Sequence, residues 1–206
     1  MTRLPKLYYI SQGRTPEEHI KGIEKVCLAG CKLVQLRLKN LPSKIIEKTA
    51  IIAKEVCDKH NTKLVINDYS KIAKNILNAG IHVGKNDDNL ADLKKTLSSV
   101  LVGGTANTID DCVKLYREGA DYIGLGPFAF TSTKSNLDPI IGIAGYKDII
   151  IKLKSLKIEM PIYAIGGITE TNIPDLLELG VHGVAISGLF ANKTEKEIKK
   201  IIDLYE

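Results

Sequence analysis

Basic side chains alternate with leucines in one short stretch near the N-terminal end of the chain. Gln35, Arg37 and Lys39 are two residues apart, so in an extended backbone all three point to one side. An Arg and a Lys that point into a protein need anionic partners. The spacing therefore predicts an anion-binding site, and the alternative is an exposed strand end.

Two aspartates follow neighbouring apolar runs further along the chain. Asn67 and Asp68 end one run, and Asp87 follows the next. Two converging carboxylates suit Mg²⁺, which keeps several waters and binds substrate phosphates. The pattern predicts a magnesium site on Asp68 and Asp87, although Asp88 satisfies the same reasoning as Asp87.

Glycines follow the last two apolar runs, at Gly166-Gly167 and Ser187-Gly188. In barrels of alternating strands and helices, backbone N–H groups at these two places hold a phosphate. The alternative is that the glycines only make tight turns.

A long polar segment, residues 131–139, stands out among short connections. Its hydroxyls, followed by a lysine, have the chemistry to surround a phosphate, and the alternative is a loop without function. The residues concerned are Thr131, Ser132, Thr133 and Lys134.

Nucleophilic catalysis is not expected. We find no Ser-His-Asp or Cys-His pair at the ends of the apolar runs, and only His82 lies near the predicted site, where a structural role is favoured. The four cysteines have no zinc-like spacing and are interpreted as small buried residues. Two anion-binding regions and a metal, without a nucleophile, predict a transfer reaction with pyrophosphate as the leaving group.

The elements that must position these residues alternate between β-branched runs and helical periods. The predicted strands are 7–10, 32–38, 64–67, 81–83, 100–103, 122–125, 162–165 and 184–186. The predicted helices are 16–29, 42–58, 70–79 (capped by Ser70), 90–97, 108–118, 145–156, 172–179 and 194–205. Glycines 30, 80, 119 and 180 are expected to end helices in the left-handed conformation.

Eight such units predict an α/β protein, a closed (β/α)₈ TIM barrel in one compact domain over residues 1–206. A doubly wound open sheet is the alternative. It is opposed by the lack of a Gly-x-Gly-x-x-Gly motif and by the spread of unusual residues over nearly every strand end.

Composition narrows the class of partner. The chain has 206 residues and a net charge of +5, from 29 Lys and Arg against 24 Asp and Glu, with 5% aromatic residues and no Trp. A nucleic-acid binder would show a basic stripe or stacking aromatics, so no nucleic-acid partner is expected. No apolar run is long enough for a membrane and the N-terminus has no secretory pattern, so we expect a cytoplasmic protein, with a homo-oligomer left open.

An ordered series of motifs resembles the thiamine phosphate synthase family over essentially the whole chain. The series is Gln-x-Arg-x-Lys (35–39), Val-Ile-Asn-Asp (65–68), Gly-Ile-His-Val-Gly (80–84) with Asp87, Gly-Leu-Gly-Pro (124–127), Thr-x-Thr-Lys (131–134) and Ala-Ile-Gly-Gly-Ile (164–168). The resemblance implies a (β/α)₈ barrel that joins a hydroxymethylpyrimidine diphosphate to a thiazole phosphate. The products would be thiamine phosphate and pyrophosphate, formed through a pyrimidine carbocation.

The resemblance also implies roles for single residues. Arg37, Lys39 and Lys134 would act on the diphosphate, with Mg²⁺ on Asp68 and Asp87. Asn67 would lie between pyrophosphate and metal, and Gln35 and Thr105 would contact the pyrimidine. The thiazole phosphate pocket would be lined by Thr131, Ser132, Thr133, Gly167, Ile186 and Ser187.

The chain departs from the family pattern at several positions. Lys85 places a positive charge beside the predicted metal, Tyr69 replaces a second Asp, and the loop before Ile186-Ser187 is one residue short. A thiazole tautomerase is the alternative enzyme, but it uses a His where this chain has Asn107. A third interpretation is a barrel that only binds a phosphorylated thiazole or pyrimidine.

Overall fold

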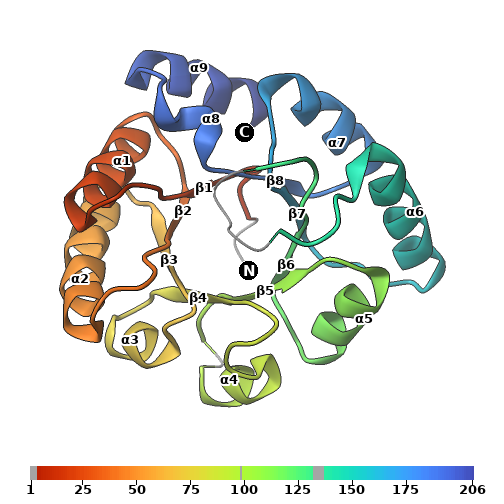
Figure 1. Ribbon diagram of the computed structural model, residues 1–206, viewed down its shortest axis with the longest axis horizontal. Coiled ribbons are helices and arrows are strands. Elements are labelled where there is room, and N and C mark those ends of the chain that lie inside the picture. Colours follow the sequence, from red (N-terminus) through yellow and green to blue (C-terminus); the bar gives the residue numbers. More distant parts are fainter. Residues whose placement is uncertain (1–3, 98, 132–136) are drawn as a thin grey trace. The chain divides into compact units, whose positions relative to one another are not determined.

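The computed structural model describes residues 4–97, 99–131 and 137–206. Within them, eight strands close a barrel in chain order from β1 to β8, which confirms the predicted fold (Figure 1). The pairs β1–β2, β2–β3, β5–β6, β6–β7 and β7–β8 run parallel. The strands are β1 (Leu7–Ile10), β2 (Leu33–Leu36), β3 (Lys63–Asn67), β4 (Gly80–Val83), β5 (Val102–Ala106), β6 (Tyr122–Leu125), β7 (Ile162–Ile165) and β8 (Gly183–Ile186).

Helices alternate with these strands along the chain. They are α1 (Pro16–Leu28), α2 (Ser43–Lys59), α3 (Ser70–Asn75), α4 (Leu90–Thr96), α5 (Ile109–Arg117), α6 (Gly142–Ser155), α7 (Ile173–Leu179), α8 (Gly188–Ala191) and α9 (Glu195–Tyr205), with a 3₁₀ turn η1 (Glu170–Asn172) before α7. No helix of the described ranges is long and apolar enough to cross a membrane.

Contacts group the described residues into two compact units. The first takes its described residues from Met1–Ile81, Ser99–Leu101 and Ile186–Glu206, and the second takes them from His82–Ser98 and Val102–Ala185.

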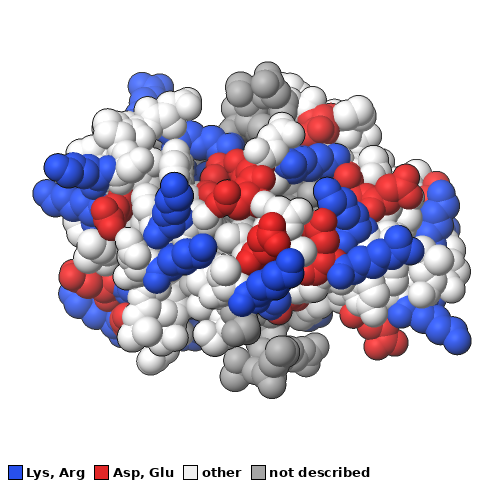
Figure 2. Space-filling view, turned by 90° about the horizontal axis from the view of Figure 1, so that it is seen from below, with Lys and Arg blue, Asp and Glu red and all other residues white. Residues whose placement is uncertain are grey.

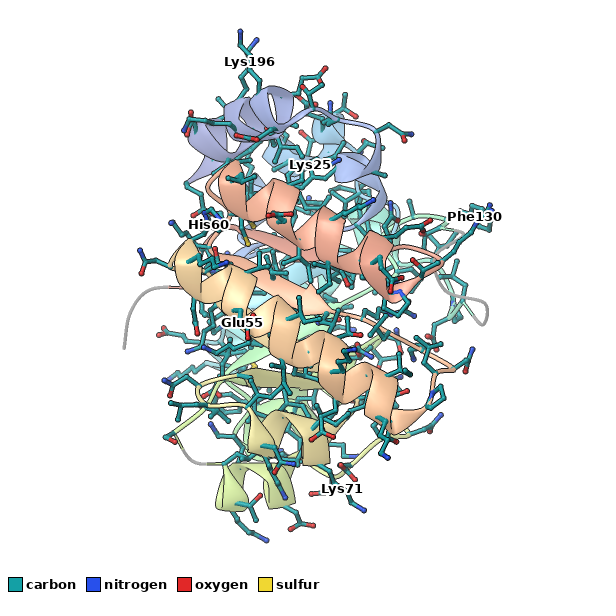
Figure 3. The ribbon with its side chains drawn as sticks, turned by 90° about the vertical axis from the view of Figure 1, so that its left-hand side faces the viewer. Lys25, Glu55, His60, Lys71, Phe130 and Lys196 are labelled. Carbon is teal, nitrogen blue, oxygen red and sulfur yellow. The ribbon has the colours of Figure 1, made fainter. Side chains whose placement is uncertain are left out.

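The first unit is built on β1, β2 and β3, with α1 and α2 side by side outside them (Figures 1 and 3). Thr15 caps α1 by accepting the Glu18 N–H at 3.3 Å, and Pro16 occupies the first turn, as the sequence predicts. The inner face of α1 buries Ile23, Val26 and Cys27. Amphipathic spacing therefore fixes which side of α1 faces the strands.

The second unit is built on β5, β6 and β7. A Cβ added at Gly103 in β5 would collide with the ring of Tyr122 in β6, so glycine provides the space for that buried ring. Thr108 and Asp111 form a reciprocal capping box at the start of α5.

Four predicted elements have wrong boundaries. The helix predicted to begin at Gly145 begins at Gly142. The strand predicted at 100–103 lies at Val102–Ala106, so Gly104 and Thr105 are inside β5 instead of after it. The helix predicted to 79 ends at Asn75, and Ser70 is its first residue while Tyr69 takes the cap position. The strand predicted at 32–38 covers only Leu33–Leu36.

Two local features also differ from the prediction. The one-turn helix α8 directly after β8 has no counterpart in it. Gly80 begins β4, and the left-handed residue before that strand is Asn78, with φ 60°. The positive φ values of Gly30, Gly119 and Gly180 confirm the other three glycine positions.

Charges of both signs are interspersed over the face drawn in Figure 2. Neighbouring charges on this face therefore largely offset one another. Elsewhere, ion pairs connect charges along and between elements, such as Lys94 with Asp121 at 2.9 Å in the second unit and Lys199 with Asp203 at 3.0 Å in the first.

Candidate active site

The first unit brings together the predicted residues that follow β2 and β3. Because β2 ends at Leu36, Arg37 and Lys39 lie in the connection to α2. Lys39 Nζ is 3.1 Å from the Asp68 carboxylate. Burial lowers the pKa of the Arg37 guanidinium, and the nearby charge of Asp68 raises it again. Two cations and one carboxylate therefore share this region, and one of the cations is partly desolvated.

Gln35 is buried within β2, with 2% of its surface exposed. Its Nε2 donates to the Tyr8 hydroxyl at 2.6 Å. Because Nε2 faces Tyr8, the amide oxygen of Gln35 faces away from it.

The turn after β3 holds Asp68 in a left-handed conformation, with φ 65°. The Tyr69 N–H donates to the Asn67 carbonyl at 2.8 Å, and the Ser70 N–H donates to the Asp68 carbonyl at 2.9 Å. A non-glycine residue with positive φ is uncommon, and Asp and Asn tolerate it best. The turn thus holds the Asp68 carboxylate where Lys39 reaches it.

Asn67 is the last residue of β3 and is 6% exposed. Its Nδ2 is buried and has no hydrogen-bond partner among the described residues. Leaving a buried donor unpaired costs free energy, so this N–H group is suited to an acceptor supplied by a ligand.

At the end of β8, Ile186 is buried and Ser187 leads into α8. The Ser187 hydroxyl donates to Gln12 Oε1 at 3.2 Å. Lys25 of α1 donates to the carbonyls of Phe190, Ala191 and Lys193 at 3.0–3.2 Å (Figure 3). The short helix is therefore held at both ends, by Lys25 of α1 and by Gln12 of the connection between β1 and α1.

In the second unit, Asp87 closes the turn after β4. Its carboxylate accepts the Gly84 N–H at 2.8 Å, and the side chain is otherwise exposed. Lys85 pairs with Asp111 of α5 at 2.6 Å, and this pairing lowers the pKa of Asp111 against the opposing effect of burial. The positive charge that departs from the family pattern is thus matched by a carboxylate of the same unit.

His82 joins Thr105 to the buried Tyr122. Its Nε2 is 3.0 Å from the Thr105 hydroxyl, its Nδ1 is 3.1 Å from the Tyr122 hydroxyl, and the two rings stack with centroids 5.5 Å apart. Burial lowers the pKa of His82 to about 4. The neutral ring therefore fixes the position of the Thr105 hydroxyl, which agrees with the structural role favoured from the sequence.

Asn107 forms a hydrogen bond with the backbone that follows β6. Its Nδ2 donates to the Gly126 carbonyl, and its Oδ1 is buried with no partner in the described ranges. The Gly126–Pro127 peptide bond is cis.

Gly167 is required by a close approach of backbones. Its φ is 68°, and a Cβ there would lie 2.6 Å from the carbonyl oxygen of Phe130. The side chain of Phe130 itself is 75% exposed (Figure 3). Thr131 follows it, whereas Ser132, Thr133 and Lys134 lie outside the described residues.

A Ser–His pair that the sequence pattern did not reveal follows the first strand. Ser11 Oγ and His19 Nδ1 are 2.7 Å apart, and both residues are buried. Ser11-Gln12 ends an apolar run in the same way as the other predicted site segments, so its position was the available signal. The described residues contain no group of three or more His, Cys, Asp or Glu that could hold a metal ion.

Comparison with known proteins identifies the family. Residues 7–189 match the family described as thiamine monophosphate synthase. A thiamine-phosphate synthase of Flavobacterium johnsoniae is 42% identical over 94% of this chain and 92% of its own length. One from Bacteroides thetaiotaomicron is 43% identical over 85% of each chain.

A solved structure shows the same fold. The thiamine phosphate pyrophosphorylase of Pyrococcus furiosus superposes with a TM-score of 0.82 at 21% identity, over 97% of this chain and 96% of that one. Because the sequence match spans nearly all the strands and helices described above, this chain belongs to the thiamine monophosphate synthase family.

Proposed function

We propose that this chain is a transferase that joins a hydroxymethylpyrimidine diphosphate to a thiazole phosphate and releases pyrophosphate. The observation that carries the proposal is the anion-binding region of the first unit. There, a partly buried Arg37, Lys39 beside Asp68 and the unpaired Nδ2 of Asn67 offer cations and a donor to a polyanion. The family of the chain supplies the substrate class.

The reaction breaks the bond between the pyrimidine methylene carbon and the diphosphate oxygen. The electron pair leaves with pyrophosphate, and the lone pair of the thiazole nitrogen then forms the new C–N bond to the methylene cation. Negative charge grows on the leaving oxygen, so cationic donors that are fixed beforehand stabilise the transition state. Arg37 and Lys39 would do this, together with Lys134.

Asn67 would donate its unpaired Nδ2–H to an oxygen of the leaving group. Gln35 and Thr105 would contact the pyrimidine, since Tyr8 and His82 respectively fix their polar ends. No protein nucleophile is needed, because the aminopyrimidine itself stabilises the cation.

Magnesium fits the donors that this chain offers. Asp68 and Asp87 present carboxylate oxygens, and Mg²⁺ commonly takes one or two carboxylates while waters and phosphates complete its shell. We propose these two residues as the ligands. When bound, the ion would neutralise charge on the diphosphate.

The phosphate of the acceptor would contact Gly167, Ile186 and Ser187, with the hydroxyls of Thr131, Ser132 and Thr133. Holding the thiazole beside the pyrimidine matters because the cation must meet the acceptor nitrogen before water does.

Pyrophosphate release from the purified protein tests the proposal, with each substrate alone, with both, and with both plus EDTA. Release that needs both substrates and metal, with thiamine phosphate formed, is the expected result. No release under any of these conditions would overturn the proposal and favour a tautomerase or a binding barrel.

A further inference from the structure

Two adjacent polar residues, Ser11 and Gln12, follow β1 and bond in different directions. Ser11 extends the pairing of β1 with β2, because its N–H donates to the Gln35 carbonyl at 2.8 Å. The Gln12 side chain accepts from Ser187, which follows β8. All of these residues belong to the first unit.

On one side, the Ser11 hydroxyl carries two hydrogen bonds. His19 Nε2 is 3.2 Å from the Gly13 carbonyl, which can only accept, so Nε2 holds the proton and Nδ1 accepts. Ser11 therefore donates to His19 Nδ1 at 2.7 Å, and its lone pairs face the Arg37 N–H at 3.0 Å.

Burial keeps this arrangement neutral. Ser11 is 2% exposed and His19 is 5% exposed. Burial is the main cause that lowers the pKa of His19, and the charge of Arg37 lowers it further. A neutral His19 thus orients the Ser11 hydroxyl, which holds the backbone of Arg37 directly after β2 ends.

On the other side, Gln12 is fixed at its backbone and at its side chain. The Tyr9 hydroxyl bonds to the Gln12 backbone, and the Tyr9 ring stacks on Phe190 of α8 with centroids 6.2 Å apart. The Gln12 amide oxygen then accepts the Ser187 hydroxyl. One strand end therefore sets the position of the residue that leads into α8.

We propose that Ser11 and Gln12 are positioning residues for the two substrates separately. Ser11, oriented by His19, sets Arg37 for the diphosphate, and Gln12 sets Ser187 for the phosphate of the acceptor. The inference rests on the function proposed above. Neither residue donates or accepts a proton of the reaction.

The test compares Ser11→Ala with Gln12→Met, which keeps the length of the side chain but removes its amide oxygen. Losing one hydrogen bond to a positioned group costs about a factor of ten in affinity. Ser11→Ala should raise KM for the pyrimidine diphosphate about tenfold and leave KM for the thiazole phosphate within about twofold. Gln12→Met should do the reverse.

Lys21→Ala is the matched control, because Lys21 is exposed on α1, the helix that carries His19. Both KM values should stay at the wild-type level. Equal changes in both KM values for Ser11→Ala and Gln12→Met, or no change in either, would overturn the proposal, because a merely structural role predicts no split. If Ser11→Ala does not fold, His19→Gln takes its place with the same expected split.

Direct binding separates this proposal from the function itself. If the wild type releases no pyrophosphate, the proposed function fails. The positioning roles of Ser11 and Gln12 are then tested by calorimetry, which measures the binding of pyrophosphate with Mg²⁺ and of inorganic phosphate. Weaker pyrophosphate binding in Ser11→Ala alone supports the proposal, whereas unchanged binding, or a wild type that binds neither anion, overturns it.

Discussion

Asp68 combines a proposed metal ligand with an uncommon backbone conformation, and this decides how it should be tested. At φ 65°, alanine would add a backbone penalty of about 1 kcal/mol to the loss of the carboxylate. Asparagine tolerates the left-handed region, so Asp68→Asn removes the charge with the turn intact.

We expect Asp68→Asn to lower turnover by roughly 100-fold or more, because losing a metal ligand removes several kcal/mol of charge stabilisation. Measured by circular dichroism, the melting temperature of Asp68→Asn should lie within a few degrees of the wild-type value. Asp92→Asn, on the exposed face of α4, is the control. Near-normal turnover of a folded Asp68→Asn variant would remove Asp68 from the metal site.

His82 predicts a pH dependence of stability. Burial lowers its pKa from 6.5 to about 4, so between these values the unfolded chain binds a proton that the native protein does not. The free energy of unfolding is therefore complete above pH 6.5 and falls by up to about 3 kcal/mol as the pH approaches 4.

Urea unfolding at pH 7.5 and pH 5 measures this dependence. The difference in the free energy of unfolding between pH 7.5 and pH 5 should be smaller in His82→Gln than in the wild type. The control His60→Gln, at the end of α2, should show the wild-type difference. An unchanged difference in His82→Gln would contradict the assignment to His82.

At the scale of elements, the periodicity of apolar residues predicts that a strand or helix is present better than it predicts where that element begins and ends. Each predicted strand and helix is present, because apolar spacing decides which face is buried. The predicted strand stops at Gly103 because glycine is a poor strand former, whereas β5 runs on to Ala106, with Gly103 leaving room for Tyr122. That contact joins two strands and is not visible in the local sequence.

The helix α8 escaped prediction for a related reason. One turn is too short to be stable by itself, so its stability must come from tertiary contacts. Those contacts are the Tyr9–Phe190 stack and the hydrogen bonds from Lys25, which is about 165 residues away in the sequence.

Lys25→Met tests how far α8 depends on α1. The variant keeps the aliphatic stem but leaves three carbonyls without their charged donor, so the free energy of unfolding should fall by about 2 kcal/mol in urea titration. Lys199→Met on the exposed face of α9 should change it by less than about 0.5 kcal/mol. A loss in Lys25→Met as small as in the control would show that α8 is held by its apolar contacts alone.

At the scale of the whole molecule, the sequence predicted the barrel, but it could not predict which polar groups meet. The alternation of eight units fixes the topology, and the order of the motifs is the basis on which the site residues are proposed. The pairing of Ser11 with His19 and of Lys85 with Asp111 depends on the packing of separate segments, which local patterns do not encode.

All four cysteines are free and buried, as the sequence indicates. A disulfide reagent should therefore label fewer than one thiol per native chain within the time that labels all four in guanidinium, because modification requires the thiolate to be exposed. The slow labelling rate of the native protein reports the opening of its core. Rapid labelling of one native thiol would show that part of the core is accessible.

The unpaired Nδ2 of Asn67 lowers the stability of the protein and is also the group proposed to bind the leaving group. Without a ligand, the buried unpaired donor lowers the free energy of unfolding by about 1–3 kcal/mol, a cost that a leucine of similar size would not have. Asn67→Leu should therefore melt at a higher temperature than the wild type and bind pyrophosphate more weakly, and a lower melting temperature would contradict this. Selection for heat resistance alone would drive this position toward an apolar residue, and retention of asparagine would then measure how strongly the proposed role in binding the leaving group is under selection.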